Sequence, residues 1–140
     1  MSRLRKLAFT LSASLLMACG GNAFTVRSLD APSLTDRYLH LVESQFALVA
    51  QSSSAADAVG RIEAYCAREA AAIEQIRKDG EDLTEAEQQE LGKQVAPRLE
   101  KLIKRAESEL ENKAHILGDQ SVLTAMANCA PRPMAEPQPE

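Results

Sequence analysis

The most reactive side chains of this sequence belong to three cysteines, Cys19, Cys66 and Cys129. The spacing of Cys66 and Cys129 does not match the CxxC pattern of redox sites or the CxxCH pattern of covalent haem. In an oxidising compartment such a pair usually forms a disulfide. Closing so long a loop stabilises a fold by about 4 kcal/mol on the chain-entropy model. We therefore predict a Cys66–Cys129 disulfide, with two buried free thiols as the alternative.

The two histidines each follow an acidic residue by four positions: His40 follows Asp36, and His115 follows Glu111. On a helix this spacing places both side chains on one face, where they can supply two metal ligands. One histidine with one carboxylate is too small a set for a metal site. A haem between helices would need inward-facing ligands, and His40 with Met126 does not fit the placement in b-type cytochrome bundles. We predict no metal site and no cofactor.

No residue pattern indicates a catalytic centre. The GxSxG sequence is absent, and any dyad with a nucleophile would need one of only two histidines. Six acidic residues surround one predicted turn: Asp79, Glu81, Asp82, Glu85, Glu87 and Glu90. They lack the DxDxDG order of a calcium loop and fit a solvated turn next to a helix N-terminus, which favours acids. We predict a non-enzymatic protein.

Residues 1–18 have the pattern of a secretory signal peptide. Arg3, Arg5 and Lys6 precede an apolar run from Leu7 to Met17. A mature membrane-spanning helix needs about 20 apolar residues, so this run is too short. A buried N-terminal helix is the alternative.

The apolar run ends in Leu16-Met17-Ala18-Cys19, which resembles the lipobox of bacterial lipoproteins. The resemblance implies that Cys19 is diacylglycerylated, that the signal peptide is cut before it, and that the new amino group is acylated. Gly20 stands where Asp would signal retention in the inner membrane. The implied location is the outer membrane, facing the periplasm. Two or three acyl chains anchor a protein stably.

The charge of the chain limits its partners. The 140 residues carry a formal charge of −4. Removal of residues 1–18 takes away three basic residues and no acidic one, which leaves −7. Such a chain lacks the basic excess that binds nucleic acid and is not attracted to anionic lipid head groups. We therefore expect membrane contact through the lipid alone. The expected partner is an unidentified envelope protein.

Composition and periodicity predict an all-α fold. Only 4% of the residues are aromatic, and helix-forming residues are abundant. Apolar residues at three- and four-residue spacing indicate three long helices that start after Ser33, Ser54 and Thr84. The second is expected to end at Gly80 and the third near Gly118. Asp119 caps a fourth, short helix.

Pro97 lies inside the predicted third helix, where it removes one hydrogen bond and crowds the preceding turn. We therefore expect a kink near Pro97. A straight helix from Glu85 to Leu117 would leave Cys66 and Cys129 about 15 Å apart on ordinary helix dimensions, too far for a disulfide. Bending at Pro97 is the favoured solution; a fourth helix that crosses the bundle, or a disulfide between chains, is the alternative.

Proline and glycine divide the mature chain. Residues 19–32 are predicted to be a flexible tether and residues 33–130 a helical domain. Residues 131–140 hold four prolines and are predicted to be a disordered tail, with a ligand for an aromatic groove as the alternative.

The segment Leu83-Thr84-Glu85-Ala86-Glu87-Gln88 resembles the Leu-Thr-x-x-Gln motif of small helical periplasmic stress chaperones and metal-resistance sensors. The Gln comes one position late and the motif occurs once. The same residues also form a capping box, Thr84 with Glu87. A lipid-anchored interaction domain is the leading interpretation, and a chaperone-like or metal-stress protein is the alternative.

Overall fold

The computed structural model describes residues 24–129. Within that range the chain forms helices and no strands, so the all-α prediction is confirmed. The elements are α2 (Leu34–Ala50), α3 (Ala55–Arg68), α4 (Ala70–Glu81), α5 (Glu85–Glu109), the 3-10 turn η1 (Glu111–Lys113), α6 (Ala114–Leu117) and α7 (Gln120–Cys129). The predicted signal peptide 1–18, Cys19 with its lipobox-like segment, and the Pro-rich tail 131–140 lie outside the described residues.

Three predicted helix starts are confirmed by their capping geometry. The hydroxyls of Ser33 and Ser54 accept hydrogen bonds from the backbone N–H groups of Asp36 and Asp57. Thr84 forms the complete capping box, because its hydroxyl accepts from the N–H of Glu87 and its own N–H donates to the Glu87 carboxylate. These bonds satisfy N–H groups that the first helical turn leaves unpaired.

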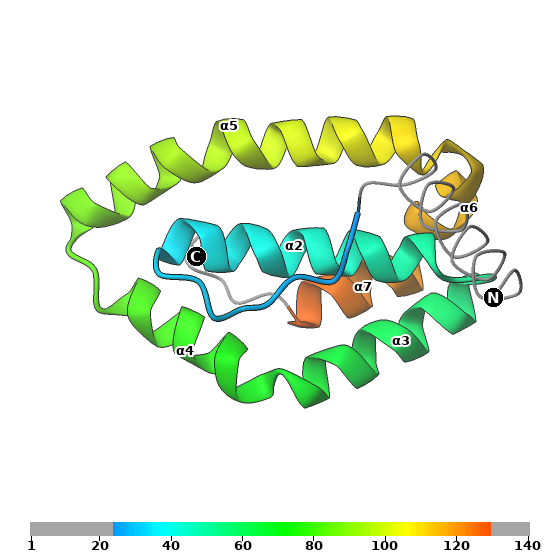
Figure 1. The fold of residues 1–140 in the computed structure, drawn as a ribbon, viewed down its shortest axis with the longest axis horizontal. Coiled ribbons are helices and arrows are strands. Elements are labelled where there is room, and N and C mark those ends of the chain that lie inside the picture. The colour runs from blue at the N-terminus through cyan, green and yellow to red at the C-terminus, as the bar shows by residue number, and fades with distance from the viewer. Residues whose placement is uncertain (1–23, 130–140) are drawn as a thin grey trace, which may run out of the picture.

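α2 lies at the centre of the domain, between α5 on one side and the arch of α3 and α4 on the other (Figure 1). It is buried on most of its surface rather than along one stripe, because helices pack on several sides of it. The buried residues of its second half include Leu41, Phe46, Ala47 and Val49. The polar Gln45 is buried too, and its amide donates to the carbonyl of Met126 on α7. α2 is therefore the shared core of the fold.

The predicted second helix is in fact two helices. α3 ends at Arg68, Glu69 leaves the helical conformation, and α4 begins at Ala70. Figure 1 shows the two helices diverging from this junction. The sequence has no Gly or Pro there, so tertiary contacts make the break. α3 packs against α7, while α4 is joined to α2 by the ion pair between Arg37 and Asp79 at 2.7 Å.

The predicted third helix also ends early, at Glu109 instead of near Gly118. α5 continues through Pro97 without interruption, and the chain turns back through η1 and α6 (Figure 1). α7 then packs along α3. The chain reversal that returns Cys129 to Cys66 thus lies after Glu109, so a bend at Pro97 is not needed to explain it. The expected bundle of three long helices and one short helix is replaced by a larger number of shorter elements.

The segment 24–32 packs on the helices, which corrects the prediction of a flexible tether for that part of 19–32. Phe24 and Leu29 are buried in the main apolar core, and the Phe24 ring meets the Phe46 ring at 5.6 Å between centroids. The backbone N–H of Arg27 donates to the hydroxyl of Ser44 on α2 at 2.8 Å. In Figure 1 this segment starts on the side of α2 that faces α5 and then crosses α2. Residues 19–23 lie outside the described residues.

Membrane-spanning character is absent from the described part of the chain. None of the helices in residues 24–129 combines the length and the apolar composition needed to cross a bilayer.

Candidate functional site

The two internal cysteines form the predicted disulfide. Cys66 near the end of α3 is bonded to Cys129 at the end of α7, with 5.7 Å between the Cα atoms. Around it the two helices meet through buried apolar residues: Ala58, Ile62, Tyr65, Val122 and Ala125. The bond therefore closes an apolar interface, and neither sulfur is available as a reactive thiol in this state.

The structure engages one histidine–acid pair in other contacts and places the members of the other pair on different elements. Nδ1 of His40 lies 3.0 Å from the carbonyl oxygen of Ser28, and the carboxylate of Asp36 pairs with Arg98 at 2.9 Å. Glu111 belongs to η1 and His115 to α6, so their spacing does not place them on one regular helix. Within residues 24–129, no group of three or more His, Cys, Asp or Glu side chains is arranged to hold a metal ion.

The acidic turn between α4 and α5 is occupied by structural contacts. Asp79 accepts from Arg37 on α2 and from Gln75 one helical turn away, and these hydrogen bonds lower its pKa. Glu81 pairs with Arg77. Glu87 accepts from the backbone N–H of Thr84, which lowers its pKa. These carboxylates act in helix and turn formation.

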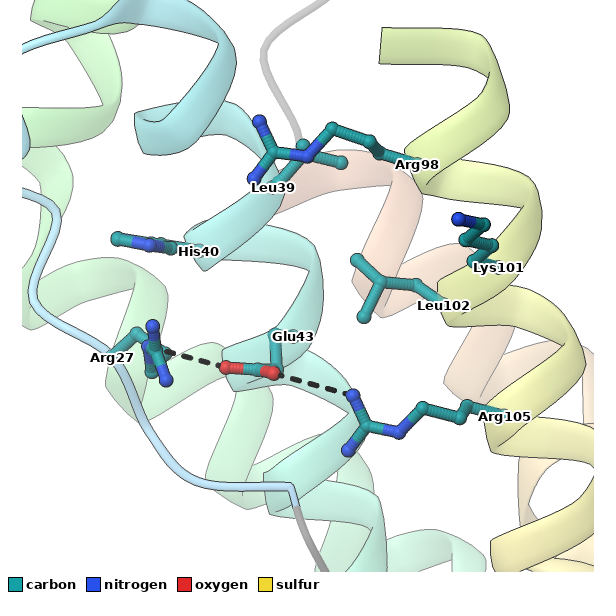
Figure 2. A pocket seen from close by; sticks show the side chains of 8 residues that line it. All are labelled: Arg27, Leu39, His40, Glu43, Arg98, Lys101, Leu102 and Arg105. Atoms are coloured by element: carbon teal, nitrogen blue, oxygen red, sulfur yellow. Dashed lines mark ion pairs between the residues drawn. The ribbon is translucent and has the colours of Figure 1, made fainter.

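A basic groove runs between α2, α5 and the segment 24–32. It has a volume of about 400 Å³ and is lined by Arg27, Leu39, His40, Glu43, Arg98, Lys101, Leu102 and Arg105. Figure 2 shows three of its cations on the side of α5 that faces α2, and Arg27 entering from the N-terminal segment. Four cations and one carboxylate thus surround one hollow in an acidic protein. We call these residues the basic groove.

Glu43 sets the electrostatics of the basic groove from α2. Its side chain is only 13% exposed, and its carboxylate lies 3.3 Å from Arg27 and 3.7 Å from Arg105. A carboxylate so poorly hydrated needs opposite charges beside it. Figure 2 shows it between the two guanidinium groups. Glu43 therefore holds the N-terminal segment and α5 against the same point of α2.

The remaining cations of the basic groove are less fully engaged. Arg98 pairs with Asp36, and contacts with Ser33 and then with Arg98 lower the pKa of the Asp36 carboxyl. Lys101 has no ion-pair partner within residues 24–129. One guanidinium nitrogen of Arg105, Nη2, is buried without a hydrogen-bond partner in the same part of the chain. The basic groove therefore keeps donor capacity for an anionic group.

Arg105 also connects the basic groove to the first described residue. The centre of its guanidinium group lies 4.2 Å from the centroid of the Phe24 ring. A cation over an aromatic face is attracted by the ring's quadrupole. This contact places Phe24 next to the basic groove.

Two further hollows have different linings. One, of about 280 Å³, lies between the first turns of α2 and α5 and contains Leu34, Leu83 and Leu91. The other, of about 370 Å³, lies between residues 28–31 and α4 and contains Arg37 and Glu69. Neither gathers more than one basic residue, so the basic groove is the more distinctive of the three.

The sequence contains a signal for the basic groove that its overall charge hides. Arg98, Lys101 and Arg105 are spaced by three and four residues, so they share one helical face. The contribution of Arg27 could not be predicted, because its segment reads as a tether. The packing of Phe24 and Leu29, with the contacts of Arg27 to Glu43 and Ser44 on α2, brings Arg27 to the basic groove.

Comparison with known proteins leaves this chain without a match: no family model, no curated protein and no solved structure matches it.

Proposed function

We propose that this chain is a bacterial envelope lipoprotein, anchored through Cys19, whose helical domain acts by binding another envelope protein rather than by catalysis. One observation carries the proposal. Cys66 and Cys129 are paired with each other, so Cys19 is the odd cysteine of the chain. An odd cysteine in an exported protein needs a separate role, and its position at the end of the lipobox-like segment supplies one, acylation.

The disulfide also supports an oxidising compartment. Disulfides persist in the bacterial periplasm and are rare in the cytosol, where thiols are kept reduced. The pair closes a sequence separation of 63 residues in a domain small enough to gain from it. The predicted signal peptide and this disulfide are both consistent with a periplasmic location.

The distribution of apolar surface favours the interaction domain over the chaperone-like alternative. A chaperone that binds unfolded clients needs a continuous exposed apolar surface. The large exposed apolar residues of the described chain are Val26, Ile103 and Leu123. They belong to three different elements, the N-terminal segment, α5 and α7, rather than to one concave patch.

Acylation of Cys19 is tested by metabolic labelling with a clickable palmitate analogue. We expect label on the full chain and none on the Cys19→Ser variant. The matched control replaces the other two cysteines together, Cys66→Ser with Cys129→Ser, and must keep the label. Label that persists in the Cys19→Ser variant would overturn the anchor.

The interaction role is tested by crosslinking the lipidated protein in cells and identifying the products by mass spectrometry. We expect one envelope protein at a fixed ratio to the chain. A broad set of unrelated unfolded proteins, increasing under stress, would instead establish the chaperone-like function.

A further inference from the structure

Four residues, 20–23, separate the proposed lipid anchor from the folded domain, and this short connection limits how far the domain can stand from the membrane. Phe24 is buried, so the chain is fixed to the helical domain at that residue. Five residue steps from Cys19 to Phe24 span at most about 17 Å when fully extended. The acyl chains hold Cys19 at the level of the lipid head groups. The part of the domain around Phe24 is therefore kept within reach of them.

The part of the domain that surrounds Phe24 is the basic groove. Arg105 stacks on the Phe24 ring, and Arg27 follows three residues later in the same segment. Both line the basic groove together with Arg98 and Lys101. Phe24, five residues after the proposed anchor, is thus in contact with a residue that lines the basic groove.

From this juxtaposition we propose that the basic groove binds the phosphate of an anionic phospholipid head group in the leaflet that holds the Cys19 anchor. This replaces the expectation, drawn from net charge alone, that the protein contacts the membrane only through its lipid. The proposal rests on the proposed function, because the anchor sets the orientation. Arginine and lysine are the side chains that recognise phosphate oxygens. A protein partner is the less suitable occupant, because the short connection holds this face against the bilayer.

The carboxylates beside the basic groove do not neutralise all of its cations. Asp36, Glu43 and Glu109 contact its arginines, so the four cations exceed their neighbouring acids by one. Glu43 engages Arg27 and Arg105 from the buried side, which leaves the outer face of the hollow to Lys101 and Arg98. Both of these are exposed. Arg98 is shared with the carboxylate of Asp36, whereas Lys101 has no ion-pair partner in the described chain and is free to meet a phosphate oxygen.

The experiment uses the mature chain, residues 19–140, with Cys19→Ser so that no lipid contributes to binding. Co-sedimentation is measured with phosphatidylcholine vesicles and with vesicles that also contain phosphatidylglycerol, at low and high salt. We expect binding only when phosphatidylglycerol is present, and loss of binding at high salt, because exposed charges are screened. Failure to bind phosphatidylglycerol vesicles at low salt would overturn the proposal.

Two matched double variants separate the basic groove from net charge. In the same Cys19→Ser chain, Arg98→Gln with Lys101→Gln removes two cations of the basic groove. Lys93→Gln with Lys104→Gln removes two exposed cations of α5 that do not line it. We expect the first pair to weaken vesicle binding by about thirtyfold and the second to have a much smaller effect. Equal losses would overturn the basic groove as the site.

Folding and ligand source need separate controls. Circular dichroism shows whether the double variant keeps its helices, and Lys101→Gln alone serves as a second variant, because Lys101 has no ion-pair partner in the described chain. Release from vesicles by inorganic phosphate at the same concentration as the lipid phosphate would overturn the head group as the ligand. Absence of acyl label on the full chain overturns the proposed function. If the full chain carries the label, absent vesicle binding by the Cys19→Ser chain overturns only this inference.

Discussion

The interface between α3 and α7 and the interface between α2 and α5 are built from different chemistry. The first is closed by buried apolar residues and the Cys66–Cys129 disulfide. The second has a small apolar cluster, Leu39 with Leu91 and Val95, at one end and the basic groove beyond it. The α3–α7 interface is thus held by apolar packing and a covalent bond. The α2–α5 interface instead leaves cationic side chains available for binding.

Removal of the disulfide has the largest expected effect on this comparison. Cys66→Ala together with Cys129→Ala should lower the free energy of unfolding by about 4 kcal/mol on the chain-entropy model. Urea unfolding followed by circular dichroism measures it. The Arg98→Gln, Lys101→Gln pair is the contrasting variant, with an expected change within about 0.5 kcal/mol because its residues are exposed. Similar losses in both would contradict the division of roles.

Phe24→Ala tests whether the N-terminal segment belongs to the domain. Truncation of this buried ring should cost about 3 kcal/mol and release residues 24–32 to proteolysis. Limited proteolysis with mass spectrometry locates the cuts. Val26→Ala is the matched control in the same segment, because Val26 is exposed. If both variants resist cleavage equally, the segment does not depend on the Phe24 contact.

The capping box of α5 is expected to have a smaller effect. Thr84→Ala removes the hydroxyl that accepts from the N–H of Glu87 and should cost about 1 kcal/mol. Thermal and urea unfolding measure the loss, with Glu90→Ala, an exposed position on the same helix, as the control. A cost no larger than that of the control would show that α5 is held by its packing alone.

Acid should weaken the contacts that Asp36 and Asp79 make with Arg98 and Arg37. Ion pairs and hydrogen bonds lower the pKa values of Asp36 and Asp79, so their stabilisation is complete above the unfolded-state pKa. It is lost as the pH falls through the lower folded-state values. The Tm should therefore fall below about pH 4, since the ordinary Asp pKa is 3.8.

A double variant checks the assignment of this acid sensitivity. Asp36→Asn with Asp79→Asn should start from a lower Tm at neutral pH and lose less of it on acidification. An unchanged loss of Tm between pH 6 and pH 3 would assign the effect to other carboxylates.

Local signals in the sequence predicted the local structure well. The helix starts at Ser33, Ser54 and Thr84 were predictable because each capping side chain acts within three residues of its own position. The disulfide was predictable from compartment chemistry and cysteine count. The all-α class was predictable from composition and from periodicity, because apolar residues three and four positions apart mark one face of a helix.

Features that depend on distant neighbours were not predictable. The break at Glu69 has no Gly or Pro to mark it, and α2 is buried on more sides than a single apolar stripe suggests. The basic groove was not predicted, because net charge averages over the whole chain. A phosphate group responds to the charges within about a Debye length of it. Its Arg27 was assigned to a tether, since nothing local shows that Phe24 and Leu29 are buried.

The position of Cys129 has a consequence for the order of folding. It is the last residue of α7, so the disulfide can form only after every described helix has been synthesised. Until then, the helices depend on their own caps and on apolar contacts. The covalent bond thus secures an arrangement of helices that packing has already selected.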